Sequence, residues 1–429
     1  MRQILSPVLN LKMVFMSEFL HVDTLEDACA KLEKHWRIKP RKVNMPLDEA
    51  AGRVLAEDVV SKIDVPSFDR AVFDGYAVRA MDTFGAGEES PVELTCVGSV
   101  RAGEWPKLKI TKRQCVEIST GAPIPRGANA VVMVEYSTVG AKVVQIFRAI
   151  APEENIAKRG SEIKHGTKVL GAGGVITPQV LGTLAAIGRK RAEVYSPSKV
   201  AVISSGAELV SAGSSLRWGK IYDVNGPAIC RAVELCGGEA NYLGVARDEP
   251  RSLANFVKRG LATCDVVVLS GGSSAGAGDI APAVIDQMGK PGVIVHGLAM
   301  KPGKPAFVTV VRGKPIFGLP GYPVSALMVF DQLVAPYLRR LSGLPRAGRA
   351  RVQAKLASKI ISARGRRELV PVKLVREGRV VYAKPLFKGS GAITALSLAD
   401  GYIDVPLNRE IVEEGEVIEV NLFRGVEVA

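Results

Sequence analysis

The second half of the chain alternates strand-like and helix-like segments, with glycine-rich turns between them. The β-branched runs 199–203 and 265–269 are each followed by a turn, and helical patterns cover residues 227–236 and 279–288. Alternation of this kind predicts an open, mostly parallel sheet with helices on both faces, which we expect over residues 198–345. Ligands of such doubly wound sheets bind at the carboxyl ends of the strands.

Three glycine-containing phrases lie at the ends of these predicted elements. They are Ser270-Gly271-Gly272-Ser273, Lys301-Pro302-Gly303-Lys304-Pro305 and Gly318-Leu319-Pro320-Gly321-Tyr322-Pro323. Glycine at a strand end lets backbone N–H groups approach a ligand closely, and lysines confined between prolines keep their charges within a limited space. We therefore expect a rigid, cationic, backbone-lined pocket for an anion at one edge of the sheet. A solvated surface position is the alternative for the two lysines.

Four acidic residues lie in or just after predicted strand-end loops of the same region: Glu208, Asp223, Asp248 and Asp279. Hard cations such as Mg²⁺ take oxygen ligands and commonly share them with a substrate phosphate, so acids beside two lysines fit a site where a metal and phosphates meet. Local roles are the alternatives for two of them. Asp279 has an equal claim to cap the helix that follows it, and Asp223 can form an Asx turn before Asn225.

The remaining segments have other patterns, so a multidomain α/β plus β chain is predicted. Residues 65–155 contain short β-branched runs separated by glycine and proline, which indicate a β-rich domain. This domain interrupts a mixed α+β domain made of residues 19–64 and 156–197. After the α/β domain, residues 346–429 alternate as strands do and predict a small β-barrel, with a sandwich as the alternative.

The first half of the chain carries a helix signal and two loop signals. Asp23-Thr24 predicts a cap for an amphipathic helix that runs to His35. The turn-rich stretches 66–78 and 119–130 predict long loops, which often carry function when they are ordered. A plain hairpin connection is the alternative for each.

Composition narrows the class of partner. A formal charge of +14 favours anionic partners, but aromatic content is only 6% and Lys and Arg are dispersed, which argues against nucleic acid. No apolar stretch is long enough to span a bilayer, so no membrane partner is expected. The six cysteines are scattered along the chain without a Cys-x-x-Cys pair. This pattern argues against a disulfide framework and predicts that the protein is located in a reducing cytoplasm.

Two weaker signals concern the source of the chain and its start. Abundant Lys and Arg beside few Asn and Gln weakly favour a thermophilic source. The first residues, up to about Phe15, are expected to lie outside the fold, with Met13 or Met16 as an alternative start.

Six phrases in a fixed order resemble the molybdopterin molybdenumtransferase family, the MoeA-type enzymes, which are related to the gephyrin E domain. Beyond the three phrases above, they are Phe73-Asp74-Gly75-Tyr76-Ala77, Thr120-Gly121-Ala122-Pro123 with Pro125 and Gly127-Ala128, and Gly389-Ser390-Gly391. The resemblance covers nearly the whole chain from about Phe19 onward.

The resemblance implies an elongated, four-domain homodimer whose central sheet is shared with MogA- and MoaB-type adenylyltransferases, which are themselves candidate partners. The implied reaction inserts molybdate or tungstate into adenylylated molybdopterin and releases AMP, with a requirement for Mg²⁺. Adenylyl transfer to molybdopterin and peptide binding by a gephyrin-like scaffold are the alternatives. The additional domains argue against the first, and the charge and retained site residues argue against the second.

The resemblance also assigns site residues by family position. Residues implied to bind the substrate or the oxyanion are Ser270, Gly271, Gly272, Ser273, Lys301, Lys304, Pro305, Pro320, Pro323, Ser325, Arg366 and Ser390. Acids implied at the pterin and metal site, catalytic together with the two lysines, are Glu208, Asp248 and Asp279. Functional positions in the amino-terminal domains, implied to face the partner subunit's cleft, are Asp69, Asp74, Thr120 and Glu162. Residues that depart from the usual family pattern are Ala207, Asn129, Tyr322 and Pro371.

Overall fold

The chain forms two compact units. The computed structural model describes residues 22–140, 143–272, 280–345, 350–386, 389 and 391–423. The larger unit lies within residues 1–43 and 195–429, and the smaller unit is Asn44–Val194.

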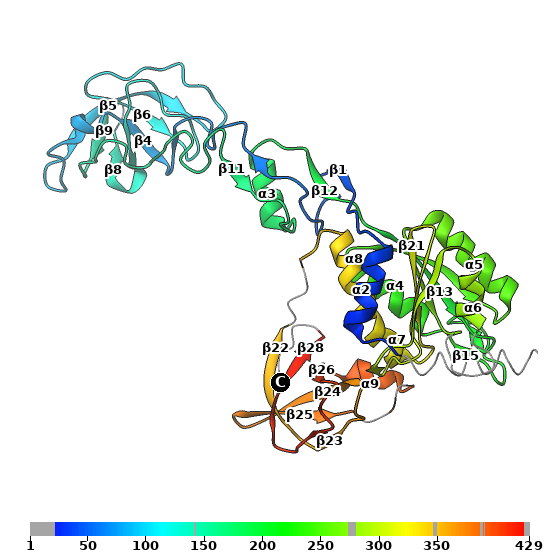
Figure 1. Ribbon diagram of the computed structural model, residues 1–429. Coiled ribbons are helices and arrows are strands. Elements are labelled where there is room, and N and C mark those ends of the chain that lie inside the picture. Colours follow the sequence, from blue (N-terminus) through cyan, green and yellow to red (C-terminus); the bar gives the residue numbers. More distant parts are fainter. Residues whose placement is uncertain are drawn as a thin grey trace, which may run out of the picture. The chain divides into compact units, whose positions relative to one another are not determined.

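A six-stranded sheet forms the centre of the larger unit (Figure 1). Its strand order is β16-β13-β17-β21-β20-β18, with bounds Glu239–Ala246, Lys199–Ser205, Val266–Ser270, Lys314–Leu319, Phe307–Val311 and Pro291–His296. The first four strands are parallel, whereas β20 runs antiparallel to both of its neighbours. The predicted mostly parallel sheet is therefore confirmed.

Helices cover both faces of this sheet, because successive side chains of a strand point to opposite sides. Along β13, Val200 and Val202 pack into one apolar cluster, and Ala201 and Ile203 pack into another. The first cluster contains residues of α2 (Leu25–His35), α4 (Asn225–Leu235), α7 (Pro323–Val329) and α8 (Ala335–Leu341). The second contains residues of α5 (Pro250–Thr263) and α6 (Ile280–Asp286). The sheet is thus doubly wound.

The helical segment that follows the third glycine phrase contains an irregular turn. A π-helical segment, η3 (Phe330–Val334), lies between α7 and α8. Pro336 lies at the start of α8 and has no N–H to donate to the preceding turn, which favours a break in the regular α-helical hydrogen bonding there.

The amino-terminal helix α2 has the predicted cap. The side chain of Thr24 accepts a hydrogen bond from the Asp27 backbone N–H at 3.1 Å, and Leu32 is fully buried. The helix packs on the sheet of the larger unit, although the predicted boundaries group it with residues 156–197, of which 156–194 lie in the smaller unit. The division into four domains stays a prediction.

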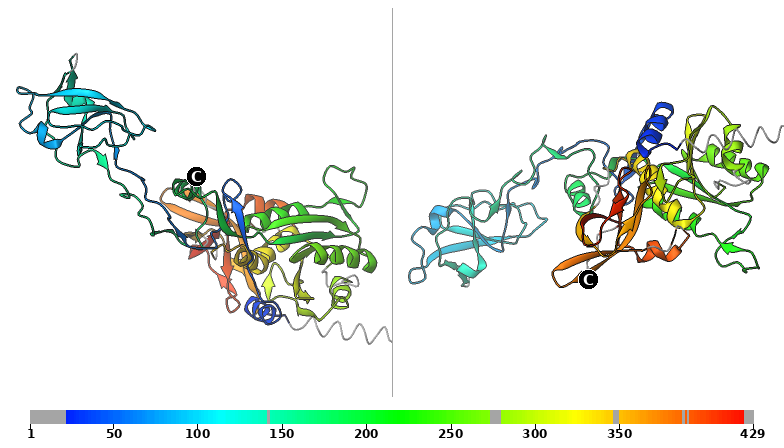
Figure 2. Two further views of the ribbon diagram at one scale, coloured as in Figure 1. Left: turned by 90° about the horizontal axis from the view of Figure 1, so that it is seen from above. Right: turned by 60° about the horizontal axis from the view of Figure 1, so that its bottom comes forward.

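The last part of the larger unit is a closed five-stranded barrel (Figure 2). Its strands pair in the order β24-β25-β22-β28-β26, with bounds Arg367–Glu377, Val380–Pro385, Arg351–Leu356, Val417–Leu422 and Gly401–Val405. The ring closes because β26 also pairs with β24. A short strand from the α/β part, β19 (Met300–Lys301), pairs parallel to β24. Two further short strands and a helix flank the barrel: β23 (Ile360–Ile361), β27 (Ile411–Val412) and α9 (Ile393–Leu398).

The smaller unit combines a β-rich part with a mixed α+β part, as predicted. Its main sheet has the order β7-β4-β6-β5-β9-β8, with bounds Ala130–Met133, Gly75–Val78, Gln114–Ile118, Val92–Val100, Val143–Ile146 and Ser137–Val139. Two short 3₁₀ helices are η1 (Ala80–Thr83) and η2 (Val134–Tyr136). The mixed part contains α3 (Pro178–Ala186) and the small sheets β10-β3 (Ile156–Ala157, Arg70–Ala71) and β11-β2 (Lys168–Leu170, Val59–Val60). Strands β1 (Lys42–Pro46) and β12 (Arg191–Tyr195) pair where the chain enters and leaves this unit.

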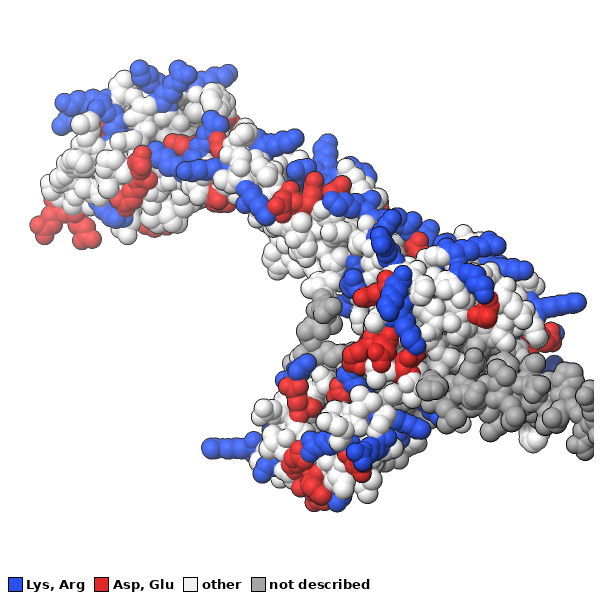
Figure 3. All heavy atoms as spheres, in the orientation of Figure 1, with Lys and Arg blue, Asp and Glu red and all other residues white. Residues whose placement is uncertain are grey.

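Charged side chains are spread over the surface of both units. Figure 3 shows Lys and Arg interspersed with Asp and Glu on the face that it presents, which agrees with the dispersed charge of the sequence. Within the described residues, no helix is long and apolar enough to cross a membrane.

Candidate functional site

The loops that follow β13, β17 and β21 meet at the carboxyl edge of the central sheet. The Gly271 N–H donates to the Leu319 carbonyl at 3.1 Å, which joins the loop after β17 to the end of β21. Gly271 has a φ of +93°, and a Cβ added there would lie 2.1 Å from the Ser205 carbonyl oxygen. Only glycine fits between these two strand ends. The Ser270-Gly271-Gly272 phrase is therefore held close to the ends of both neighbouring strands, β13 and β21.

Asn225, at the start of α4, links the end of β17 to the loop after β21 through hydrogen bonds. Its Nδ2 donates to Ser270 Oγ at 2.9 Å and to the Gly321 carbonyl at 2.8 Å, and Ser270 Oγ donates in turn to the Pro320 carbonyl at 3.4 Å. The Asn225 side chain is buried. Asn225 was not predicted as a site residue, and its only sequence signal is its position at the start of a helix beside an Asp.

Asp223 is a structural carboxylate, which supports the Asx-turn alternative given for it. It is 4% exposed and accepts hydrogen bonds from Ser204 Oγ at 2.7 Å and from Tyr242 Oη at 2.5 Å. It also accepts from the backbone N–H groups of Asn225 and Gly226, at 3.1 and 3.0 Å, and so caps α4. The pKa of the Tyr242 phenol is raised, mainly because the side chain is buried and also because it donates a hydrogen bond to Asp223.

Two of the predicted metal-binding acids lie close to the end of β13. Asp248 Oδ1 accepts from Ser205 Oγ at 2.7 Å, and its Oδ2 accepts from the Ala207 N–H at 3.3 Å. The Glu208 carboxylate oxygens lie 2.9 Å from the position of a Cβ built on Gly206. Both carboxylates are exposed, and such oxygen donors suit Mg²⁺.

The third predicted ligand, Asp279, lies outside the described residues, as do Ser273 and Ser390. Among the residues that the structure does describe, no three His, Cys, Asp or Glu side chains form a group that could hold a metal. The predicted three-acid site therefore stays a prediction.

The lysine loop reaches the same edge of the sheet as the glycine loops. It directly precedes β20, whose first residue Phe307 pairs with Gly318 near the end of β21. Because β20 is antiparallel to β21, its start lies at the carboxyl end of β21. The Leu298 N–H donates to the Lys304 carbonyl at 2.9 Å, and a Cβ on Gly303 would lie 2.6 Å from Met300 Cε. The backbone of the lysine loop is thus closely packed.

The barrel contributes to this edge through strand β24. The register of β19 with β24 places Lys301 opposite Glu368, and Lys301 Nζ lies 2.8 Å from Glu368 Oε1. The predicted Arg366 directly precedes β24 and is half-buried. Its neighbour Arg367 instead binds Asp404 at 2.9 and 2.5 Å, and this hydrogen bonding raises the pKa of the guanidinium.

The third glycine phrase also lies between the sheet and the barrel. Pro323 starts α7, whose first turn contains the buried Ser325, and the half-buried Pro305 ends the lysine loop. A Cβ added to Gly391, the residue after Ser390, would lie 3.4 Å from Tyr322 Cδ1. The carboxy-terminal phrase therefore approaches the loop after β21.

The predicted residues of the smaller unit form local contacts within that unit. Asp74 Oδ1 accepts from the Thr120 N–H at 2.8 Å, so these two lie together. Asp69 Oδ1 accepts from the Arg159 N–H at 2.8 Å, and Lys158 Nζ lies 3.3 Å from Asp69 Oδ2. The fourth, Glu162, pairs with Arg70 at 3.4 Å.

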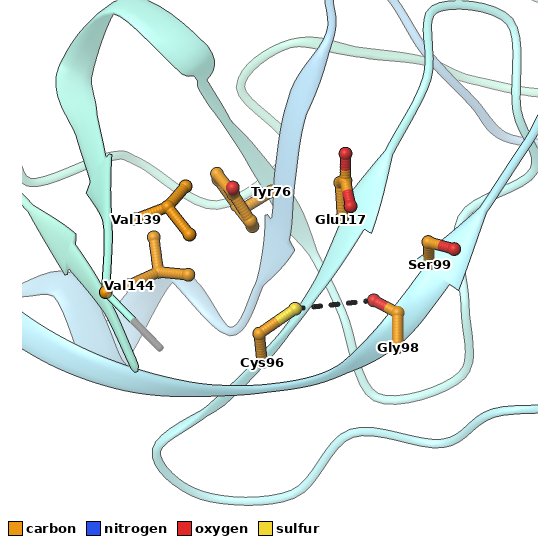
Figure 4. A pocket seen from close by; sticks show the side chains of 8 residues that line it. Tyr76, Cys96, Gly98, Ser99, Glu117, Val139 and Val144 are labelled. Atoms are coloured by element: carbon orange, nitrogen blue, oxygen red, sulfur yellow. Dashed lines mark hydrogen bonds between the residues drawn. The ribbon is translucent and has the colours of Figure 1, made fainter. Parts of the chain in front are cut away.

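A pocket of about 340 Å³ in the smaller unit is a competing candidate (Figure 4). Cys96 points toward the Gly98 carbonyl at 3.4 Å, and Glu117 and Tyr76 lie opposite. None of the eight described residues that line it is Lys or Arg. A carboxylate without a cation does not suit an anion, so the sheet edge is the better anion site.

Comparison with known proteins accounts for nearly all of the chain. Three family models match: the MoeA N-terminal region (domain I and II) over residues 23–188, a probable molybdopterin binding domain over 201–340, and the MoeA C-terminal region (domain IV) over 353–423. Molybdopterin molybdenumtransferase 2 of Mycobacterium tuberculosis is 36% identical over 386 residues, which are 89% of this chain and 95% of the relative.

The chain belongs to the MoeA family of molybdopterin molybdenumtransferases.

Solved MoeA structures have the same architecture. A MoeA protein from Pyrococcus horikoshii is 42% identical with a TM-score of 0.81, and covers 95% of this chain and 100% of its own. A second from the same organism is 32% identical with a TM-score of 0.75 and covers 94% of this chain. Among curated relatives, a putative molybdopterin biosynthesis protein of Methanocaldococcus jannaschii is 32% identical over 92% of this chain and 95% of its own length.

Within this MoeA fold, the site described above is formed by two matched regions. The glycine and lysine loops lie in the molybdopterin-binding region, and Glu368 lies in the MoeA C-terminal region. The resemblance inferred from six phrases is therefore confirmed at the level of the family.

Proposed function

We propose that this MoeA-family protein inserts molybdate or tungstate into adenylylated molybdopterin and releases AMP, as a step of molybdenum cofactor biosynthesis. The observation that carries the proposal is that the glycine loop after β17 and the lysine loop before β20 lie at the same edge of the sheet. An outward-turned backbone suits a pyrophosphate, and confined lysines suit a tetrahedral dianion. The names of the curated relatives support the same chemistry.

Each part of the site has a task in this proposal. The backbone at Gly272, after the Gly271 N–H that is bonded to Leu319, holds the phosphates of the adenylylated pterin, while Lys301 and Lys304 stabilise the oxyanion and the charge on the departing AMP. The dithiolene sulfurs of the pterin then take up the molybdenum.

A magnesium ion is part of the proposal as well. Glu208 and Asp248, joined by Asp279, would hold it, and it would supply positive charge to the phosphates. The exposed carboxylates of Glu208 and Asp248 beside Ser205 support this assignment.

We also propose a cytoplasmic homodimer. The four functional positions of the smaller unit would face the cleft of the partner subunit, and MogA- or MoaB-type adenylyltransferases would supply the substrate. The six cysteine thiols fit a reducing compartment. Dimerisation can be checked by light scattering of the full chain.

Release of AMP from adenylylated molybdopterin in the presence of molybdate and Mg²⁺ tests the proposal. We expect Lys304→Met and Asp248→Asn each to lower the rate by about a hundredfold, because each removes a charge at the reacting phosphates. The matched control is Lys373→Met, which removes an exposed lysine from β24 of the barrel and leaves the rate unchanged. Wild-type rates of AMP release in both site variants would refute the assignment of these residues. A pterin product that contains no molybdenum would favour the alternative reaction, adenylyl transfer to molybdopterin.

A further inference from the structure

One lysine of the lysine loop is held by a carboxylate that the proposed reaction leaves without a role. Lys301 Nζ lies 2.8 Å from Glu368 Oε1. The Lys301 side chain is 51% exposed, whereas that of Glu368 is 11% exposed. The ammonium therefore faces solvent at the sheet edge, while the carboxylate behind it is shielded by the barrel.

The buried carboxylate of Glu368 is stabilised by the ammonium group of Lys301. Its second oxygen, Oε2, is buried and has no hydrogen-bond partner in the described part of the chain. A buried carboxylate with an unsatisfied oxygen is costly, and an ammonium beside its other oxygen offsets part of that cost. Lys301 is thus drawn toward one fixed position.

The pairing of the two strands does not itself require the Glu368 side chain. The Arg367 N–H donates to the Ala299 carbonyl at 2.9 Å, and Met300 and Lys301 are in register with Arg367 and Glu368. These backbone contacts anchor β19 to the barrel. The Glu368 carboxylate is therefore available for another purpose, namely to hold Lys301.

Holding the lysine has two opposite consequences for an anion at this edge. An ammonium has three N–H donors, so Lys301 can keep one bond to Glu368 and direct another at an oxyanion. Fixed orientation favours reaction, because less freedom is lost when the bound groups react. The negative charge of Glu368, however, repels the same oxyanion and weakens its binding.

We propose that Glu368 is the positioning residue of Lys301, and that it orients this lysine for metal transfer at the expense of oxyanion affinity. The proposal rests on the proposed function for the identity of the oxyanion. It assigns to the carboxy-terminal barrel a direct influence on the chemistry at the sheet edge.

The test compares Glu368→Gln with the wild-type full chain. The variant keeps the shape of the side chain and removes its charge. We expect the KM for molybdate in AMP release to fall about tenfold, because repulsion is lost, and kcat to fall about tenfold, because Lys301 is no longer fixed. The dissociation constant for tungstate, measured by equilibrium dialysis without pterin, should fall by a similar factor.

Two further variants serve as controls. Glu419→Gln breaks an ion pair of the same 2.8 Å length with Arg351 elsewhere on the barrel, and should leave all three constants unchanged. In a Lys301→Met background, Glu368→Gln should no longer lower kcat, because there is no lysine left to orient.

Opposite results would overturn the proposal. A kcat and a tungstate affinity within twofold of wild type would show that Glu368 does not act through Lys301. A rise in KM together with a lower unfolding midpoint would show a merely structural role. If the wild type releases no AMP, the proposed function fails, but the tungstate dissociation constants still test the role of Glu368. If neither the wild type nor Glu368→Gln binds tungstate, the proposed role of Glu368 is overturned as well.

Discussion

Gly271 allows the loop after β17 to lie against the end of β13, because it has no side chain. Its left-handed backbone and the Ser205 carbonyl 2.1 Å from a built Cβ leave no room for a side chain. We expect Gly271→Ala to lower the free energy of unfolding by about 1–3 kcal/mol, measured by denaturant titration, and to abolish AMP release.

The same substitution at Gly182 is the matched control. This glycine lies in α3, and a Cβ added there meets no atom within 4 Å. Alanine should therefore raise the free energy of unfolding, by up to about 1 kcal/mol. A Gly271→Ala protein as stable and active as wild type would contradict the close approach of the two loops.

At the scale of elements, α4 depends on the buried cap formed by Asp223. This carboxylate accepts four hydrogen bonds, two from side chains and two from backbone N–H groups of the helix. We expect Asp223→Ala to lower the free energy of unfolding by about 1–3 kcal/mol, because buried donors lose their acceptor. Tyr242→Phe removes one of the four bonds and should cost about 1 kcal/mol. Equal stability of all three proteins would contradict this role.

The elements themselves were largely predictable from periodicity and turn residues. The glycine phrases mark the ends of β17 and β21, and the cap at Thr24 marks the start of α2. The π-helical segment η3 was not predicted, because one proline in a helical pattern does not show how the surrounding turn relaxes.

The contacts that complete the site were not predictable in the same way. Asn225 reaches loops after two other strands, and Glu368 reaches Lys301 from the barrel. Such pairs come from segments far apart in the chain, so no local pattern reports them. The family resemblance supplied Arg366 by position, but it could not show that Arg367 is engaged by Asp404. Asn129, which departs from the family, accepts from the Ala80 N–H at 2.7 Å and thus has a local structural role.

At the scale of the whole molecule, the two units have separate apolar cores. Three clusters of buried residues lie entirely within Asn44–Val194, and the other three lie within the larger unit. Since the three clusters of the smaller unit lie entirely within it, we expect a fragment of residues 44–194 to fold without the rest of the chain. A far-ultraviolet circular dichroism spectrum without β-structure would contradict this expectation.

We propose that the glycine and lysine loops form one oxyanion site at the carboxyl edge of the sheet. A crystal of the full chain soaked in tungstate is the decisive experiment, because tungsten is located by its anomalous scattering. We expect the strongest anomalous peak to lie beside the ammonium groups of Lys301 and Lys304, and we expect Lys304→Met to abolish it. A strongest peak in the smaller unit, or one that persists unchanged in the variant, would contradict it.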